Sequence, residues 1–150
     1  MILTEPYSWR SDPAVPAFPD ERPLIVFDGE CVLCSANARF VLRHDKSGAF
    51  RLTTAQGALG QALYRHFGLA TSGYETMLVL EGGRLLTESD AALAIAHALG
   101  WPWRAAGAFG LVPRRVRDAC YRLVARNRFR LFGRRQSCFA PAAGDRDRIL

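Results

Sequence analysis

The feature that most constrains this fold is a pair of cysteines placed directly after a short apolar run. Leu24–Phe27 is apolar and partly β-branched, which is typical of a buried strand, and a turn at Asp28 ends it. From Cys31 to about His44 the apolar residues follow the spacing of an amphipathic helix. A strand that leads through a turn into a helix opening with Cys31 and Cys34 predicts an α/β domain with two thiols at the junction.

The rest of the chain adds three short strands and several helices. Apolar runs bounded by turn residues predict the strands, and apolar residues three and four positions apart predict the helices. This order of elements is found in thioredoxin-like domains, so we expect a central mixed sheet of about four strands flanked by helices, with a helical C-terminal extension. The further strands are expected at about 50–53, 75–80 and 84–87, and the further helices at about 58–67, 91–99, 104–109 and 113–128.

The N-terminal segment is rich in proline. Five of the eight prolines lie within residues 1–23. Because proline fixes φ and removes a backbone donor, we expect residues 8–23 to lack regular structure. We therefore divide the chain into an N-terminal arm at 1–23, lying on the domain surface, and a thioredoxin-like domain at 24–150. The basic helical extension of that domain begins at about residue 104.

Positive charge is concentrated in the C-terminal third. Residues 1–103 carry eight Lys and Arg against eleven Asp and Glu, a net charge of −3, whereas residues 104–150 carry twelve Arg against three Asp, a net charge of +9. Such a region suits nucleic acid, an anionic membrane surface or an acidic protein partner. We interpret it as a mainly solvated helix face. Nucleic acid is a disfavoured partner, because base-stacking aromatics are not interleaved with the arginines.

Composition also bears on location. Four cysteines in 150 residues are too few for a disulfide scaffold. The longest apolar stretches, such as 91–99, are shorter than the roughly 20 residues that span a bilayer. The first residues lack the basic and apolar regions of a secretory signal. These features lead us to expect a cytoplasmic protein with no membrane span.

The spacing of the cysteine pair indicates redox chemistry. Cys31 is expected to be exposed at the N-terminus of its helix, where unpaired N–H groups and the helix dipole favour a thiolate, and Cys34 lies one turn inward. We predict Cys31 as the nucleophile and Cys34 as the resolving thiol of dithiol–disulfide exchange. Two alternatives remain: packing cysteines, or half of a metal site. Because Cys120 and Cys138 are isolated in the sequence, we expect no metal or cofactor.

Two more predictions concern Asp28 and the C-terminal helix. The Asp28 carboxylate could cap the helix that follows it or accept a proton from Cys34, and both roles remain open. The C-terminal helix carries an apolar stripe that we expect to pack inward, with Cys120 in the core. The stripe comprises Val116, Cys120, Leu123, Val124 and Asn127, and we expect Trp101, Trp103 and Phe109 to pack at the joint before it.

The stretch from Phe27 to Cys34, with Asp28 and Cys31 in it, resembles the signature of the DCC-type (Asp-Cys-Cys) thiol–disulfide oxidoreductase family. The likeness runs from about 24 to 141, with further landmarks at 88–91, 111–113, 121–128, 130–133 and Cys138. It implies a bacterial-type thioredoxin-like enzyme that exchanges a dithiol with a protein or small-thiol substrate and needs an electron donor. The rival hypothesis is a non-enzymatic thioredoxin-fold module whose arginine-rich helix docks an acidic partner.

The resemblance adds two candidate accessory residues. Thioredoxins carry a cis-proline before their third core strand, facing the cysteines, but residues 70–80 contain no proline. Tyr74, Glu75 or Thr76 must therefore occupy that place, and we carry Thr76 forward. Cys138 matches a family landmark, which makes it a candidate third redox thiol, with a surface or packing cysteine as the alternative.

Overall fold

The computed structural model describes residues 6–71, 74, 76–134, 139–140 and 143–150. Within these residues the predicted order of strands and α-helices is confirmed, except that the short helix before the last long one is a 3-10 helix. Two further 3-10 helices, at Ser8–Ser11 and Ala143–Arg148, were not predicted. The strands are β1 (Leu24–Phe27), β2 (Arg51–Thr54), β3 (Leu78–Glu81) and β4 (Arg84–Thr87). The α-helices are α1 (Val32–His44), α2 (Ala58–His66), α3 (Glu88–Ala98) and α4 (Arg114–Phe132), and the 3-10 helices are η1 (Ser8–Ser11), η2 (Trp103–Leu111) and η3 (Ala143–Arg148).

The strands form one mixed sheet in the order β2-β1-β3-β4. β1 runs parallel to β2 and antiparallel to β3, and β3 and β4 form an antiparallel hairpin. The hairpin turns at Gly82 and Gly83, whose φ angles of 58° and 82° suit glycine and a two-residue turn. This α/β architecture is consistent with the thioredoxin-like fold that the sequence predicts.

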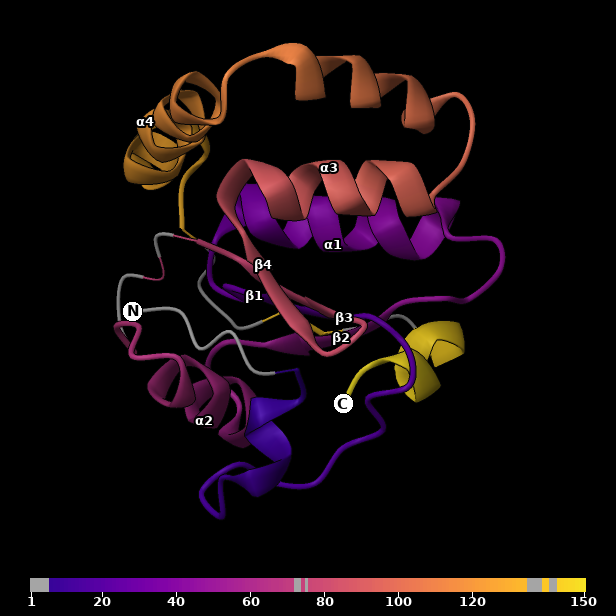
Figure 1. Cartoon of the computed structure of the whole chain (residues 1–150), viewed down its shortest axis with the longest axis vertical. Helices are drawn as coiled ribbons and strands as arrows, with labels where there is room; N and C mark the ends of the chain where they lie inside the picture. The colour runs from indigo at the N-terminus through magenta and orange to yellow at the C-terminus, as the bar shows by residue number, and fades with distance from the viewer. Residues whose placement is uncertain (1–5, 72–73, 75, 135–138, 141–142) are drawn as a thin grey trace.

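Helices cover both faces of the sheet, so β1 is buried on both sides. Figure 1 shows α1 and α3 on one face and α2 with the N-terminal segment on the other. Successive strand residues point to opposite faces. Leu24 and Val26 therefore pack in the cluster under α2, while Ile25 and Phe27 pack in the cluster under α1 and α3. The C-terminal end of β1 thus reaches the α1 side of the sheet, where the cysteine pair follows.

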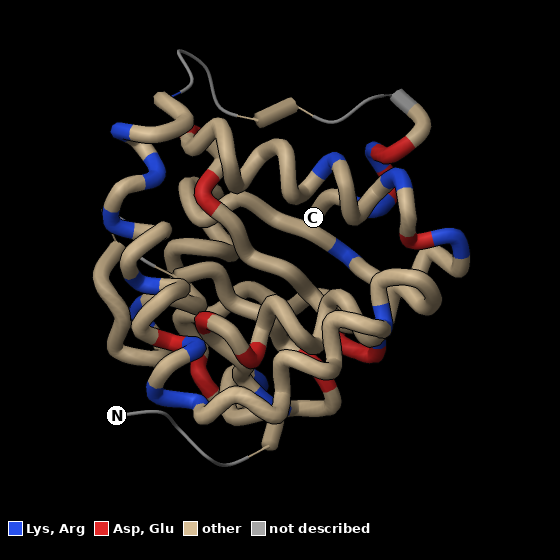
Figure 2. The backbone as a smooth tube through the Cα atoms, turned by 90° about the horizontal axis from the view of Figure 1, so that it is seen from above, with Lys and Arg blue, Asp and Glu red and all other residues tan. Residues whose placement is uncertain are grey.

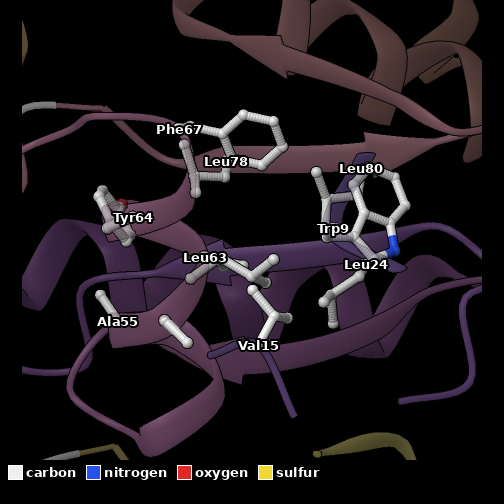
Figure 3. Close-up of a cluster of buried hydrophobic side chains, with 11 residues drawn as sticks. Trp9, Val15, Leu24, Ala55, Leu63, Tyr64, Phe67, Leu78 and Leu80 are labelled. Atoms are coloured by element: carbon white, nitrogen blue, oxygen red, sulfur yellow. The ribbon is translucent and has the colours of Figure 1, made fainter. Parts of the chain in front are cut away.

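The N-terminal arm contributes to the core. It contains the 3-10 helix η1, which was not expected, and Trp9 of that helix is only 3% exposed. Trp9 packs with Leu24, Leu63 and Phe67 in the cluster shown in Figure 3. Its indole N–H donates a hydrogen bond of 2.9 Å to Asp20, which satisfies the polar end of the ring.

Helix α4 faces the domain with its polar side, so the predicted apolar stripe is wrong. Val116, Leu123 and Val124 are exposed, and Cys120 is exposed rather than in the core. Ion pairs and hydrogen bonds determine the orientation: Arg117 contacts Asp90 at 3.1 Å, Asp118 accepts a hydrogen bond from Ser89, and the Tyr121 hydroxyl accepts one from the Met77 N–H at 3.3 Å.

Of the three aromatic residues before α4 that were predicted to pack, one packs against the domain and two are exposed. Trp103 packs against Phe40 and His44, as predicted. Trp101 is 73% and Phe109 63% exposed, so their predicted packing is wrong. Trp103 is turned toward α1, whereas the rings of Trp101 and Phe109 lie mostly in solvent.

The arginines of α4 are mostly solvated, as predicted, but Arg128 is buried and Arg117 nearly so. In Figure 2 the blue positions recur along the left side, which is the side that α4 occupies in Figure 1. No helix in the described part of the chain is long and apolar enough to cross a membrane.

Trp9 and Trp101 allow a matched test of the arm. Trp9→Ala should lower the free energy of unfolding by about 3–5 kcal/mol, because it leaves a cavity in the core. Trp101→Ala should change it by less than about 0.5 kcal/mol, because that ring lies in solvent. Denaturant unfolding of both variants measures the difference, and equal losses would contradict a core role for the arm.

Candidate functional site

The end of β1 and the start of α1 place the two cysteines one helical turn apart. Cys31 is the N-cap of α1, and its Sγ accepts a hydrogen bond of 3.2 Å from the backbone N–H of Cys34. The N–H of Cys31 donates to the Asp28 carbonyl at 3.3 Å, which closes the turn after β1. A sulfur at this position satisfies an N–H group that the first turn of the helix leaves unpaired.

This geometry stabilises a thiolate on Cys31. The thiol of Cys34 donates a hydrogen bond that lowers the pKa of Cys31 to about 6, with smaller contributions from the Cys34 N–H and the charge of Arg128, while burial opposes them. The hydrogen bond to Cys31 and burial raise the pKa of Cys34 well above its ordinary value. The pair therefore holds one proton on Cys34 and a negative charge on Cys31.

The exposure of the two cysteines is the reverse of the prediction. Cys31 is 0% exposed, whereas Cys34 is half-buried. The chain returns over Cys31 after α4, where Arg134 forms a β-bridge with Cys31 and the Gly133 carbonyl accepts a hydrogen bond of 3.4 Å from Val32. The residues that cover Cys31 lie about a hundred positions further along the chain, so the sequence around the cysteines does not predict its burial.

Asp28 and Arg128 form a buried ion pair beside the cysteines. The distance between Asp28 Oδ2 and Arg128 Nη2 is 3.2 Å, and each side chain is 4% exposed. Asp28 Oδ1 also accepts hydrogen bonds from the Gln56 amide at 2.6 Å and the Glu30 N–H at 3.0 Å. Arg128 donates a further hydrogen bond to a carbonyl of its own helix at 2.8 Å. Asp28 therefore does not cap α1, since Cys31 occupies that position.

A cavity of about 410 Å³ opens between α1 and α4, next to Cys34. Asp28 and Arg128 lie in its wall, Thr76 and Tyr74 line it before β3, and Cys31 is not among its lining residues. A cavity of this size and largely apolar character is typical of small-molecule sites. Its lining comprises Phe27, Asp28, Leu33, Cys34, Asn37, Tyr74, Thr76, Met77, Cys120, Tyr121, Val124, Ala125 and Arg128.

The structure thus brings together some of the predicted site residues. Asp28, Cys34 and Thr76 line the cavity, and Cys31, which does not, is joined to Cys34 by the hydrogen bond between its Sγ and the Cys34 N–H. The hydroxyl of Thr76 accepts a hydrogen bond of 2.9 Å from the N–H of Glu88. Cys138 and Glu75 lie outside the described residues. Among the residues that are described, no three His, Cys, Asp or Glu side chains are placed to hold a metal ion.

Sequence reasoning missed Arg128, Gln56 and Tyr121. Arg128 was counted with the solvated arginines of α4. Its spacing from Ala125 and Tyr121 places all three on one side of a helix, but nothing in the sequence marks that side as the buried one. Gln56 gave no signal, because it lies in the loop after β2 and meets Asp28 only in the folded sheet.

The ion pair can be tested by removing one partner. Arg128→Met should lower the free energy of unfolding by about 3–5 kcal/mol, because the Asp28 carboxylate stays buried without its charged partner. Adding Asp28→Asn should recover part of this loss. Arg126→Met, at an exposed position of the same helix, is the control and should have little effect in denaturant unfolding. Equal losses in both single variants would contradict the buried pair.

The pKa of Cys31 predicts a pH dependence. In the reduced protein the ultraviolet absorbance of the thiolate should be present at neutral pH and disappear as the pH falls through about 6. Cys31→Ala should lack this transition, and so should the oxidised protein. A transition near the ordinary value of 9.0 would show that the helix terminus and Cys34 do not stabilise the thiolate.

The chain is similar in sequence to known proteins over most of its length. The chain is 34% identical to the uncharacterized protein YuxK of Bacillus subtilis (strain 168) over 127 residues, which cover 85% of this chain and 93% of that protein. It is also 34% identical to a chloroplastic DCC family protein of Arabidopsis thaliana over 120 residues, which cover 79% of this chain and 70% of that protein. No solved structure gives a significant match. The family model of the DCC1-like thiol-disulfide oxidoreductases matches residues 25–134, which contain the cysteine pair, Asp28 and Arg128, and the chain belongs to this family.

Proposed function

We propose that the protein is a thiol–disulfide oxidoreductase whose redox couple is Cys31 and Cys34. The observation that carries the proposal is the geometry of the pair: Cys31 is the N-cap of α1, and its Sγ accepts a hydrogen bond of 3.2 Å from the N–H of Cys34. This arrangement lowers the pKa of Cys31 to about 6. A thiolate next to a thiol, one helical turn apart, is the reduced form of a couple that can close to a disulfide. Family membership supports redox chemistry on thiol or disulfide substrates.

The exchange leaves atoms and electrons balanced within the pair and its substrate. When the couple is oxidised, a bond forms between the two sulfurs, and two electrons and the proton of Cys34 leave. The electrons pass to a substrate disulfide, which takes up that proton and a second one from solvent and becomes two thiols. When the couple is reduced, two substrate thiols supply the same electrons and become a disulfide, and one of their protons returns to Cys34 while the other goes to solvent. No bound cofactor is needed for either direction.

Asp28 acts in this proposal as a positioning residue. Its carboxylate accepts hydrogen bonds from Arg128, Gln56 and the Glu30 N–H, so it holds the Arg128 guanidinium beside the pair. The charge of Arg128 lowers the pKa of both cysteines, and the charge of Asp28 raises both. Thr76 lines the cavity beside Cys34, where it would contact a substrate. A direct proton transfer to Asp28 and a redox role for Cys138 stay predictions.

A redox titration tests the proposal. The protein is equilibrated in dithiothreitol or glutathione buffers of graded potential, and each cysteine is scored by alkylation and mass spectrometry. We expect a reversible two-electron transition confined to Cys31 and Cys34. Cys31→Ser is the control and should abolish it. A pair that stays reduced across the whole range would refute the proposed function.

A further inference from the structure

We propose that the cavity between α1 and α4 is the substrate pocket, that it takes a small and largely apolar thiol or disulfide, and that the mixed disulfide with substrate forms on Cys34 rather than on Cys31. The inference rests on the proposed function and reverses the roles that the motif alone predicts for the two cysteines.

Cys34 is the more accessible of the two sulfurs. A substrate sulfur can react only with a sulfur that it can reach. Cys31 is 0% exposed and lies beneath the bridge to Arg134, whereas Cys34 is half-buried and lines the cavity. The bridge is held by the Val32 hydrogen bond to Gly133 and by an ion pair of 3.2 Å between Arg134 and Glu30. A substrate that enters the cavity therefore meets Cys34 first.

The charge distribution of the pair favours the same assignment. In exchange, the better leaving group is the thiol of lower pKa, and a substrate thiolate that attacks Cys34 expels Cys31. Cys31 is the sulfur whose negative charge the helix terminus already stabilises, at a pKa of about 6. Attack on Cys31 would instead expel Cys34, whose pKa is raised.

The steps balance as follows. A substrate thiol loses its proton to solvent and its sulfur attacks Cys34 of the oxidised protein; the bond between substrate and Cys34 forms, the bond between Cys31 and Cys34 breaks, and the electron pair stays on Cys31. A second substrate thiol then attacks the substrate sulfur, a substrate disulfide leaves, and Cys34 takes the proton of the second thiol. Two thiols are oxidised and the protein disulfide is reduced. In the reverse direction Cys34 attacks the substrate disulfide and its proton passes to the substrate thiolate that leaves. The Cys31 thiolate then attacks Cys34, the bond between Cys34 and substrate breaks, and the second substrate thiolate takes a proton from solvent.

The lining of the cavity indicates the substrate class. Most of the wall beside Cys34 is apolar, from Leu33, Met77 and Val124. The charges of Asp28 and Arg128 are paired with each other, so the wall offers no net charge to a ligand. The hydroxyls of Thr76 and Tyr121 add polar groups at the side. This favours a neutral aromatic or aliphatic thiol over a charged peptide thiol.

Matched cysteine variants test the site of the mixed disulfide. Cys31→Ser and Cys34→Ser are treated with dithiodipyridine, a small aromatic disulfide, and the adduct is located by peptide mass spectrometry, which also separates any reaction at Cys120. We expect Cys31→Ser to form an adduct on Cys34 at least about tenfold faster than Cys34→Ser forms one on Cys31, because access limits the second reaction. A faster adduct on Cys31, or none on Cys34, would overturn the inference. If the wild-type couple still titrates reversibly, the proposed function survives that result.

A second pair of variants tests the pocket. Val124→Trp should fill part of the cavity and slow the adduct on Cys34 in the Cys31→Ser background. Leu123→Trp is the control, because Leu123 is the neighbouring exposed residue and does not line the cavity. Equal rates in the two variants would show that the substrate does not enter through this cavity. Each probe's rate is divided by its rate with a small free thiol, because dithiodipyridine has the better leaving group. On this relative scale glutathione disulfide, a charged peptide probe, should react with Cys34 more slowly than dithiodipyridine, and the reverse order would overturn the assigned substrate class.

Discussion

The buried ion pair between Asp28 and Arg128 joins the two parts of the chain that build the site. The partners are a hundred residues apart in sequence, one in the turn after β1 and the other in α4. In the described part of the chain, Ala125 and Arg128 are the only buried residues of α4. Burying two charges is costly unless both are paired and hydrogen-bonded, and here Gln56 and the Glu30 N–H complete the shell of Asp28. The position of α4 therefore depends on satisfying charges more than on burying apolar surface.

That position decides how the cysteine pair meets solvent. With α4 held against α1, the space between them becomes the cavity beside Cys34, and the chain that leaves α4 returns over Cys31. The ion pair between Asp28 and Arg128 thus holds α4 where the cavity opens beside Cys34 and where the residues after α4 cover Cys31. It also places the Arg128 charge where it lowers the pKa of both sulfurs.

The sequence predicts the sheet and the cysteine motif because both are local. The apolar run of β1, the Gly82 and Gly83 turn and the position of Cys31 at a helix start each depend on a few neighbouring residues. The orientation of α4 depends instead on partners in the turn after β1 and at the start of α3, which no periodicity in the helix itself encodes. Apolar spacing therefore selected the wrong side of α4 and placed Cys120 in the core. The prediction that Cys31 is exposed is wrong for the same reason, because the residues that cover it, Gly133 and Arg134, follow α4 in the chain.

The bridge over Cys31 also bears on the chemical survival of the thiolate. Oxidation by peroxides to sulfenic and higher acids follows thiolate character and access together. Cys31 combines a lowered pKa with 0% exposure. Gly133 and Arg134 lie against the motif, and the Phe139 N–H donates a hydrogen bond to the Gly29 carbonyl. Small oxidants in solution therefore have less access to Cys31 than to its half-buried partner Cys34.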